Sequence, residues 1–371
     1  MNSKQRIMAS LEGKPVDRMP VTVPYIELYH QDHFSELTGK AFWEVYRWHY
    51  AEPAEYLSIY RDMIDKVPFD IMEPSGASCR HIEFVRKNGH MCLYDRRTDT
   101  YQPIDHKLSG EHPFDYTANE TQRVFCREDV RKQVPIVKAE TRPANVEGRD
   151  HTKAVVREFG KDNFIAAHMT GILWNCHWHL GQTNMLCMLI DNPDLVRCLS
   201  DRLLENTIES IRAGCAVGYD GFFIDDAMAY SDMISVRHYE QFSLPYLKAM
   251  VDEIHRLGRK AILIYFGGVS DRLEQIVATG ADGLLVEASM KNYVNDIVHI
   301  AEKIGKRITL FGNIDPIGIL ENGTDEQLEA EVQRQALAAK KSRGFVMSTG
   351  SPITPKTSLS RVQKFIKLGN Q

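Results

Sequence analysis

The sequence has no long apolar run, no closely paired cysteines and no large excess of either charge. No stretch approaches 18 uninterrupted apolar residues, so a membrane-spanning helix is not expected. The 7 cysteines are scattered without CxxC spacing, and the polar start Met1–Arg6 is unlike a targeting segment, which together predict a reduced, cytoplasmic protein. A net charge of -5 provides no general attraction to nucleic acid or to an anionic membrane, and neither is expected as a partner.

Several catalytic and nucleotide-binding signatures are also missing. The sequence contains no GxSxG motif, and no Ser-His-Asp arrangement can be argued from its spacing. The glycines near residues 267 and 350 lack the spacing of a phosphate-binding loop. These absences argue against a serine hydrolase and against a nucleotide-binding enzyme.

The sequence does contain short apolar segments that alternate with amphipathic helical segments. The expected strands and their exits cover residues 21–25, 69–73, 164–168, 221–226, 261–268, 283–287, 309–315 and 345–351. This alternation predicts parallel strands covered by helices, the pattern of an α/β protein. The later strands end in polar residues, which predicts a (β/α)8 TIM barrel, because the active site of such a barrel lies where its strands end.

Other segments predict how the rest of the chain is organised. Helices are expected at residues 3–12 and 40–66, and Asn88-Gly89 between two alternating segments predicts a β-hairpin. Residues 78–150 are polar and rich in proline, and we interpret them as an insertion with connecting segments. The expected organisation is a single barrel domain over residues 1–371, with an N-terminal helical segment and an inserted hairpin region.

Six segments follow one another in an order that is informative as a set. They are Arg6–Val21, Ala216–Gly221 leading to Asp225 and Asp226, His238–Tyr246, Gly280–Gly283, Gly312–Pro316 and Gly350–Pro355. In this order they resemble the uroporphyrinogen decarboxylase superfamily, which also contains corrinoid-dependent methyltransferases. The resemblance implies a (β/α)8 barrel, and a homodimer would fit it.

Two departures from the family pattern bear on the reaction. The coenzyme M methyltransferases carry a His-x-Cys-Gly zinc motif where this chain has Ile264 and Phe266, and a further cysteine where it has Ser351. Zinc activates a thiol through such soft ligands, so their loss argues against coenzyme M as the acceptor, while zinc on other ligands is left open. The decarboxylases carry an arginine-rich segment where this chain reads Tyr25–His30. A substrate with many carboxylates needs arginine partners, which argues against a porphyrinogen substrate.

Four residues near the strand ends are the predicted catalytic residues: His168, Asp226, Glu287 and Tyr265. His168 is expected to bind a metal, donate a proton or bind substrate, with a buried, hydrogen-bonded histidine as the structural alternative. Glu287 suits proton transfer, with an ion pair to Lys291 as its alternative. Tyr265 stands between the two positions of the family's zinc motif and suits a hydrogen bond.

Four further residues are predicted to bind substrate: Asn313, Asp225, Trp174 and Ser351. Asp225 and Asp226 are neighbours on a strand, so only one of them is expected to face the barrel interior. The amide of Asn313 suits a hydrogen bond to substrate. Trp174 begins a Trp- and His-rich stretch that is expected to be a loop, and its ring suits the face of an aromatic or corrin ring.

The resemblance, with these departures, implies a methyltransferase of a corrinoid-dependent system. It would move a methyl group from a small donor, an aryl methyl ether or a methylamine, to the Co(I) of cobalamin carried by a partner corrinoid protein. One alternative is a lyase that decarboxylates a small acid or a porphyrinogen-like substrate. Another is a non-catalytic protein that binds a tetrapyrrole or a corrinoid.

Overall fold

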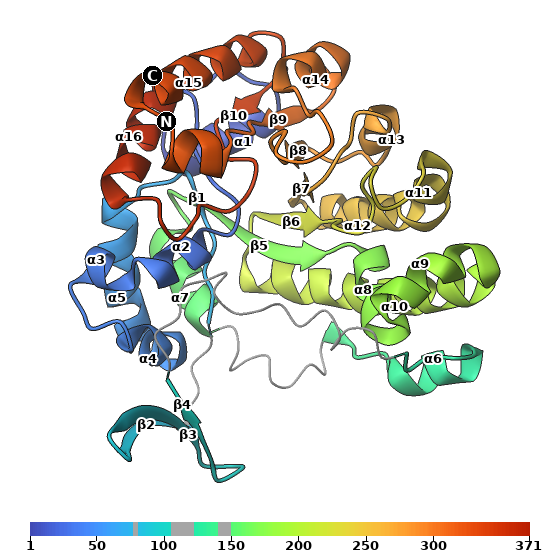
Figure 1. Ribbon diagram of the computed structural model, residues 1–371, viewed down its shortest axis with the longest axis horizontal. Helices are drawn as coiled ribbons and strands as arrows, with labels where there is room; N and C mark the ends of the chain where they lie inside the picture. Colours follow the sequence, from blue (N-terminus) through green and yellow to red (C-terminus); the bar gives the residue numbers. More distant parts are fainter. Residues whose placement is uncertain (77–80, 105–121, 140–149) are drawn as a thin grey trace.

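The computed structural model of the protein describes residues 1–76, 81–104, 122–139 and 150–371 (Figure 1). Parallel strands form a curled sheet in the order β1-β5-β6-β7-β8-β9-β10. These strands are β1 (Ile71–Met72), β5 (Phe164–Thr170), β6 (Gly221–Asp225), β7 (Lys260–Tyr265), β8 (Gly283–Val286), β9 (Thr309–Phe311) and β10 (Phe345–Val346). Each of these strands overlaps a strand expected from the sequence, and only their ends differ, by a few residues.

The segment around Val21 fills the eighth position of the barrel. Val21 forms a parallel bridge with Met347, and the N–H of Thr22 donates to the carbonyl of Met347 at 2.9 Å. On the other side of this segment, the N–H of Asp70 donates to the carbonyl of Val21 at 2.8 Å. The ring of strands is thus closed between β10 and β1, and the predicted (β/α)8 barrel is confirmed.

The strand expected at residues 21–25 is reduced to this one bridge. Pro20 and Pro24 have no N–H to donate to a neighbouring strand. Tyr25 has a φ of 54° in the left-handed region, and helix α2 begins at the next residue. The backbone therefore leaves the barrel wall at Tyr25.

Helices form the outer layer of the barrel and the connections between strands (Figure 1). In the described part of the chain they are α1 (Ser3–Leu11), α2 (Ile26–Asp32), α3 (Phe34–Thr38), α4 (Glu44–Tyr50), α5 (Pro53–Lys66), α6 (Arg127–Gln133), α7 (Asp150–Phe159), α8 (Ile172–Leu180), α9 (Gln182–Asp191), α10 (Pro193–Val217), α11 (Val236–Phe242), α12 (Leu244–Arg256), α13 (Leu273–Ala278), α14 (Ile297–Ile304), the π-helix η4 (Pro316–Glu321), α15 (Asp325–Ala339) and α16 (Leu359–Gly369). None of these helices is both long enough and apolar enough to cross a membrane.

Alternate residues of each strand face opposite sides of the barrel wall, which separates two apolar layers. Phe223 and Leu285 belong to the layer inside the barrel, and Ile7 of α1 packs against this layer at the amino end of the strands. Ile224 and Val286, their next neighbours in sequence, belong to the layer between the sheet and the helices. The same alternation decides which polar side chains at the strand ends face inward.

The predicted hairpin is confirmed and belongs to a separate small sheet. Strands β2 (Ile82–Lys87) and β3 (His90–Asp95) pair antiparallel, and β4 (Thr100–Pro103) adds to β3. Asn88 and Gly89 both have positive φ, at 51° and 83°, which is the geometry of a two-residue hairpin turn. This sheet projects from the barrel beside α4 (Figure 1). The third strand, β4, was not expected from the sequence.

Two sequence predictions of local structure are wrong. The single helix expected at residues 40–66 is two helices, because Ala51 is extended, with ψ 159°, and Pro53 starts α5. Trp48 of α4 is 1% exposed and stacks on Tyr56 of α5 with ring centroids 4.9 Å apart, which holds the two helices together. The Trp- and His-rich stretch that begins at Trp174 is helix α8 rather than a loop.

Candidate active site at the carboxyl ends of the strands

Several polar side chains at the carboxyl ends of the strands face the barrel interior. Asp225 follows the interior residue Phe223 by two positions, and Glu287 follows the interior residue Leu285 in the same way. His168 stacks on Phe223 with ring centroids 5.0 Å apart, which places its ring inside the barrel as well. The carboxyl end of the barrel therefore collects two carboxylates and an imidazole at its mouth.

A connected set of polar groups joins three strand ends to the segment after Val21. Nε2 of His168 lies 2.7 Å from Oε2 of Glu73, the residue that follows β1. The ring of Tyr25 stacks on His168 with centroids 4.0 Å apart, and its hydroxyl donates to Oδ2 of Asp225 at 2.8 Å. Together with Glu27 in the first turn of α2, these residues are called the acid–imidazole cluster (Tyr25, Glu27, Glu73, His168 and Asp225).

Burial changes the proton affinity of this cluster. It raises the pKa of Asp225 to about 6, although the hydrogen bond from Tyr25 opposes the change. It also raises the pKa of Glu27 to about 7, and the negative charge of Glu73 adds to the effect. Burial lowers the pKa of His168, but the charge and hydrogen bond of Glu73 together with the charges of Glu27 and Asp225 more than offset it, so that this pKa lies above its usual value. The cluster therefore holds exchangeable protons near neutral pH.

Several atoms of the cluster have no hydrogen-bond partner among the described residues. Oε1 of Glu73, Oδ1 of Asp225 and Nδ1 of His168 are all buried and unpaired. The side chains of Glu73 and Asp225 belong to residues that are only 4% and 8% exposed. Buried polar atoms are normally hydrogen-bonded, so unpaired ones at a strand end indicate a place where a ligand completes the contacts.

Glu287 forms a second polar centre at the same end of the barrel. Lys291 donates to its Oε2 at 2.9 Å, and the hydroxyl of Tyr293 donates to the same oxygen. Ser351 donates to Oε1 at 3.2 Å. The ion pair to Lys291, the structural alternative from the sequence, is therefore present. Glu287 and Ser351, predicted from separate motifs, are in direct contact.

Asp226 and Tyr265 lie on the other side of the barrel wall, towards the helices. Ser243, before α12, donates to Asp226, which is 0% exposed. The hydroxyl of Tyr265 lies 2.7 Å from that of Tyr239 on α11. Burial raises the pKa of Asp226 to about 7. A methyl group at Gly171 would come within 2.3 Å of Oδ1 of Asp226, so this glycine permits the close packing. The structure separates these two predicted catalytic residues from His168 and Glu287.

Asn313 and Trp174 occupy two further strand exits. The Asn313 amide donates to the carbonyl of Asn295 at 2.7 Å, and its backbone N–H donates to Gln335 of α15 at 3.1 Å. Asn313 is 5% exposed, and these contacts within the protein occupy most of its hydrogen-bonding groups. Trp174 lies half-buried in the first turn of α8, directly after β5, with its ring 4.7 Å from that of His177.

Sequence reasoning did not select Tyr25, Glu27 or Glu73 as site residues. Glu73 has the same signal as Asp225, because it follows the interior residue Ile71 by two positions at a strand end. Tyr25 and Glu27 have no such signal. They reach the site because the backbone turns inward at the left-handed residue Tyr25, which propensity and periodicity do not predict.

The residues present do not fit a zinc ion of the kind that the family resemblance implies. Ile264 belongs to the interior apolar layer and Phe266 packs against it, while Ser351 binds Glu287. Within the described ranges, no three His, Cys, Asp or Glu side chains lie close enough together to hold a metal ion.

Comparison with known proteins agrees with the fold and the motifs. The family model named uroporphyrinogen decarboxylase (URO-D) matches residues 147–371. The uroporphyrinogen decarboxylase of Tolumonas auensis is 30% identical over 182 residues, which are 48% of this chain and 49% of that protein. The methylcobamide:CoM methyltransferase MtbA of Methanosarcina acetivorans is 26% identical over 215 residues, which are 58% of this chain and 60% of that protein. The chain thus spans about half the length of the curated relatives it matches.

A solved structure has the same fold over the whole chain. The structure described as a methyltransferase from Methanosarcina mazei superposes with a TM-score of 0.68 and 19% identity, and covers 100% of this chain and 98% of that one. The family match includes all strands from β5 to β10 and with them His168, Asp225 and Glu287. The match covers well over half of the 371 residues. The chain belongs to the uroporphyrinogen decarboxylase (URO-D) family.

Proposed function

We propose that this protein is a methyltransferase that moves a methyl group from a small donor to the corrinoid of a partner protein. The observation that carries the proposal is the acid–imidazole cluster, because it presents carboxylates where a polycarboxylate substrate would need cations. In the described part of the chain, the cations that pair with the inward carboxylates are His168 and Lys291. No arginine is among them. A relative named as a methylcobamide:CoM methyltransferase lends further support.

The proposed step needs a donor held in line with its acceptor and control of one proton. The bond from the methyl carbon to its heteroatom breaks, and the heteroatom keeps the electron pair. The acceptor is the reduced corrinoid of the partner, which enters as a co-substrate and supplies the electron pair of the new bond. An oxygen leaving group takes up a proton, and Asp225, with a pKa of about 6, is a suitable source.

The remaining residues take supporting roles in this proposal. The Glu73–His168 pair binds the donor through its unpaired atoms, Oε1 and Nδ1. Glu287 and Ser351 line the opposite strand ends, and Trp174 suits the face of the corrin ring. Asp226 and Tyr265 act as positioning residues, because they contact the helices rather than the barrel interior.

The acceptor is proposed to be a corrinoid rather than a thiol, on the evidence of three side chains. Ile264, Phe266 and Ser351 stand where soft metal ligands would activate a thiol, and none of them is a zinc ligand of that kind. This favours the half-reaction that loads the corrinoid over the one that unloads it.

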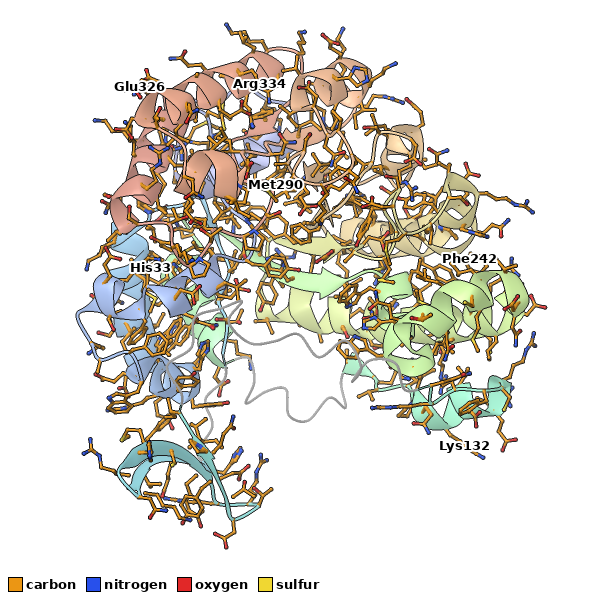
Figure 2. The ribbon with its side chains drawn as sticks, viewed as in Figure 1. His33, Lys132, Phe242, Met290, Glu326 and Arg334 are labelled. Atoms are coloured by element: carbon orange, nitrogen blue, oxygen red, sulfur yellow. The ribbon has the colours of Figure 1, made fainter. Side chains whose placement is uncertain are left out.

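A parallel assay tests the proposal. The purified protein is incubated with chemically reduced cobalamin together with one methyl donor at a time: tetramethylammonium, trimethylamine or 2-methoxyphenol. Methyl transfer is followed by the change in corrinoid absorbance. We expect protein-dependent transfer from at least one donor, reduced in Glu73→Gln and unchanged in Glu326→Gln. Glu326 is a suitable control because it lies exposed on the outer helix α15 (Figure 2). Failure of every donor would contradict the proposal.

Decarboxylation is a second candidate, favoured by one observation. Loss of carbon dioxide leaves a carbanion that must take up a proton, and Glu27 and Asp225 hold protons near neutral pH. Relatives named uroporphyrinogen decarboxylase match the chain. Release of carbon dioxide from a carboxylic acid in the absence of corrinoid, without any methyl transfer, would decide for this candidate. Cobalamin binding without turnover of either kind would instead indicate a binding protein.

A further inference from the structure

We infer that the site binds its donor as a cation, a quaternary ammonium or protonated tertiary amine carrying N-methyl groups, held between carboxylates and aromatic rings. The inference rests on the proposed function for the fate of the methyl group. The binding site itself is argued from contacts at the carboxyl end of the barrel, and it can be tested without turnover.

Negative charge is the first element of this site. Glu73 and Asp225 face the barrel interior, are at least nine-tenths buried, and each leaves one carboxylate oxygen unpaired. Oε2 of Glu27 is buried and unpaired as well. Among the described residues, the positive partner of this group is His168, which binds Glu73. A cationic ligand would supply the missing positive charge, whereas a carboxylate or phosphate ligand would be repelled.

Aromatic rings are the second element. Tyr25 follows the segment that closes the barrel and Phe266 follows β7, and their ring centroids lie 6.0 Å apart. Tyr230 packs over Gly267, where an added methyl group would come within 2.2 Å of its ring. The pKa of Tyr230 is raised by burial and then by the charges of Asp232, Glu287 and Asp225, so its hydroxyl lies in the electric field of Glu287 and Asp225, which both face the barrel interior. Aromatic faces combined with carboxylates are the usual means of binding quaternary ammonium groups.

An ammonium group of the protein already occupies part of this surface. Nζ of Lys291 lies 2.9 Å from Glu287, 3.3 Å from the carbonyl of Phe266 and 6.0 Å from the ring centre of Tyr293. Its side chain is 51% exposed, so this contact is made at the edge of the site. Carboxylate, carbonyl and ring thus bind one ammonium here, whereas among the described residues the acid–imidazole cluster has the imidazole of His168 as its positive partner and no ammonium.

A methylated ammonium also fits the proposed reaction. When the methyl carbon leaves a positive nitrogen, the nitrogen keeps the electron pair and departs as a neutral amine, so no proton has to be supplied. The carboxylates bind the positive donor more strongly than the neutral amine that leaves. Their effect should therefore appear in a lower KM for the donor and in weak binding of the neutral product, rather than in kcat.

The experiment compares two ligands of the same shape. Choline and its neutral isostere 3,3-dimethylbutan-1-ol are titrated into the full-length protein by isothermal calorimetry at pH 7.5, with tetramethylammonium as a second cation. We expect the neutral compound to bind at least about tenfold more weakly than choline. Choline affinity should fall about tenfold in Asp225→Asn and a few-fold in Phe266→Leu. It should stay unchanged in the exposed control Glu326→Gln.

The pH dependence gives an independent readout that a fold defect would not reproduce. Asp225 has a pKa of about 6 and Glu27 of about 7, and a bound cation favours their charged forms. Choline affinity should therefore rise between pH 5.5 and pH 7.5, with release of protons on binding. In Asp225→Asn this rise should be smaller.

The outcomes separate this inference from the proposed function. Equal binding of choline and its neutral isostere, or choline binding indifferent to Asp225→Asn and Glu73→Gln, would overturn the inference. Methyl transfer from 2-methoxyphenol alone would also overturn it and leave the methyltransferase standing. Tight, pH-dependent choline binding with no methyl transfer from any donor, 2-methoxyphenol included, would support the cation site and contradict the methyltransferase.

Discussion

Carboxylate side chains have different partners at the two ends of the barrel. Three strands carry a carboxylate at both ends, and the pairs are Asp70 and Glu73 on β1, Asp220 and Asp225 on β6, and Asp282 and Glu287 on β8. At the amino end every one of these carboxylates has a cationic partner. At the carboxyl end, the described residues leave two of them with unpaired oxygens.

The amino end is built for stability. Asp70 is 1% exposed and binds Arg6 at 2.7 Å and Arg18 at 2.8 Å, and it also accepts the N–H of Val21 at 2.9 Å. Asp220 binds Lys4 at 2.7 Å. These contacts tie α1 and the closing segment to the strands.

The carboxyl end contains the same chemistry without the matching charge. Glu73 is paired with a histidine, and Asp225 with the neutral hydroxyl of Tyr25. Burial without a strong cation keeps such groups ready to accept a proton or a positive ligand. The difference indicates that charges at one end hold the barrel closed and that those at the other are available for a substrate.

The largest expected effect is at the amino end. Asp70→Asn removes the charge that pairs with two arginines, one of which, Arg6, is 5% exposed. Breaking such a buried pair should cost about 3–5 kcal/mol of unfolding free energy. Chemical denaturation measures the loss, and activity per folded molecule should stay close to that of the wild type. An Asp70→Asn protein as stable as the wild type would show that the charges at the amino end do not hold the barrel together, and would contradict the proposed difference between the two ends.

The second effect is at the carboxyl end and has the opposite character. Asp225→Asn should lower kcat/KM for methyl transfer from an ammonium donor about tenfold, mainly through a higher KM, because binding of the cation loses a carboxylate. The unfolding free energy at pH 8 should be unchanged or higher, because a buried, poorly paired charge is removed. Asp220→Asn, at the other end of the same strand β6, is the matched control and should lose stability while it keeps activity.

The third prediction concerns pH. The pKa of Asp225 in the folded protein is about 6 and that of Glu27 about 7, both above the usual values of carboxyl groups. The folded protein therefore binds more protons than the unfolded chain between about pH 4 and pH 7, so these two groups contribute stability at low pH that is lost as the pH rises. Denaturation curves of Asp225→Asn should show a weaker loss across this range than the wild type.

The amino end should show the opposite sign. Arg6 holds the pKa of Asp17 well below its usual range. The stability that this contact contributes is present above about pH 4 and is lost as the solution is acidified. A variant Asp17→Asn should therefore be less stable than the wild type by a constant amount from pH 5 to pH 7, and this difference should shrink as the pH falls below about 4.

The smallest expected effect lies between the sheet and the helices. Tyr265→Phe removes one buried hydrogen bond to Tyr239 and should cost about 1 kcal/mol of unfolding free energy. If Tyr265 only positions the wall, kcat/KM should change by no more than a few-fold. A loss comparable to that of Asp225→Asn would restore Tyr265 to the catalytic role predicted from the sequence.

The barrel could be predicted from the sequence because short apolar runs alternate with amphipathic helical segments. This pattern can be recognised without knowledge of the tertiary structure. The sequence placed His168, Asp225 and Glu287 at strand ends for the same reason. It could not tell which of Asp225 and Asp226 faces inward, because that depends on where the strand leaves the wall. It also missed Tyr25 and Glu27, because a left-handed residue after a proline brings them over the barrel.

The titration of Asp225 in the folded protein tests the central claim most directly. Carboxyl groups labelled with carbon-13 are followed by NMR from pH 3 to pH 9, and the Asp225 signal is assigned by its loss in Asp225→Asn. An uncompensated carboxylate at the mouth predicts a midpoint near 6, which falls when choline is added. A midpoint below about 4, the range of an ordinary aspartate, with no response to choline, would contradict the account.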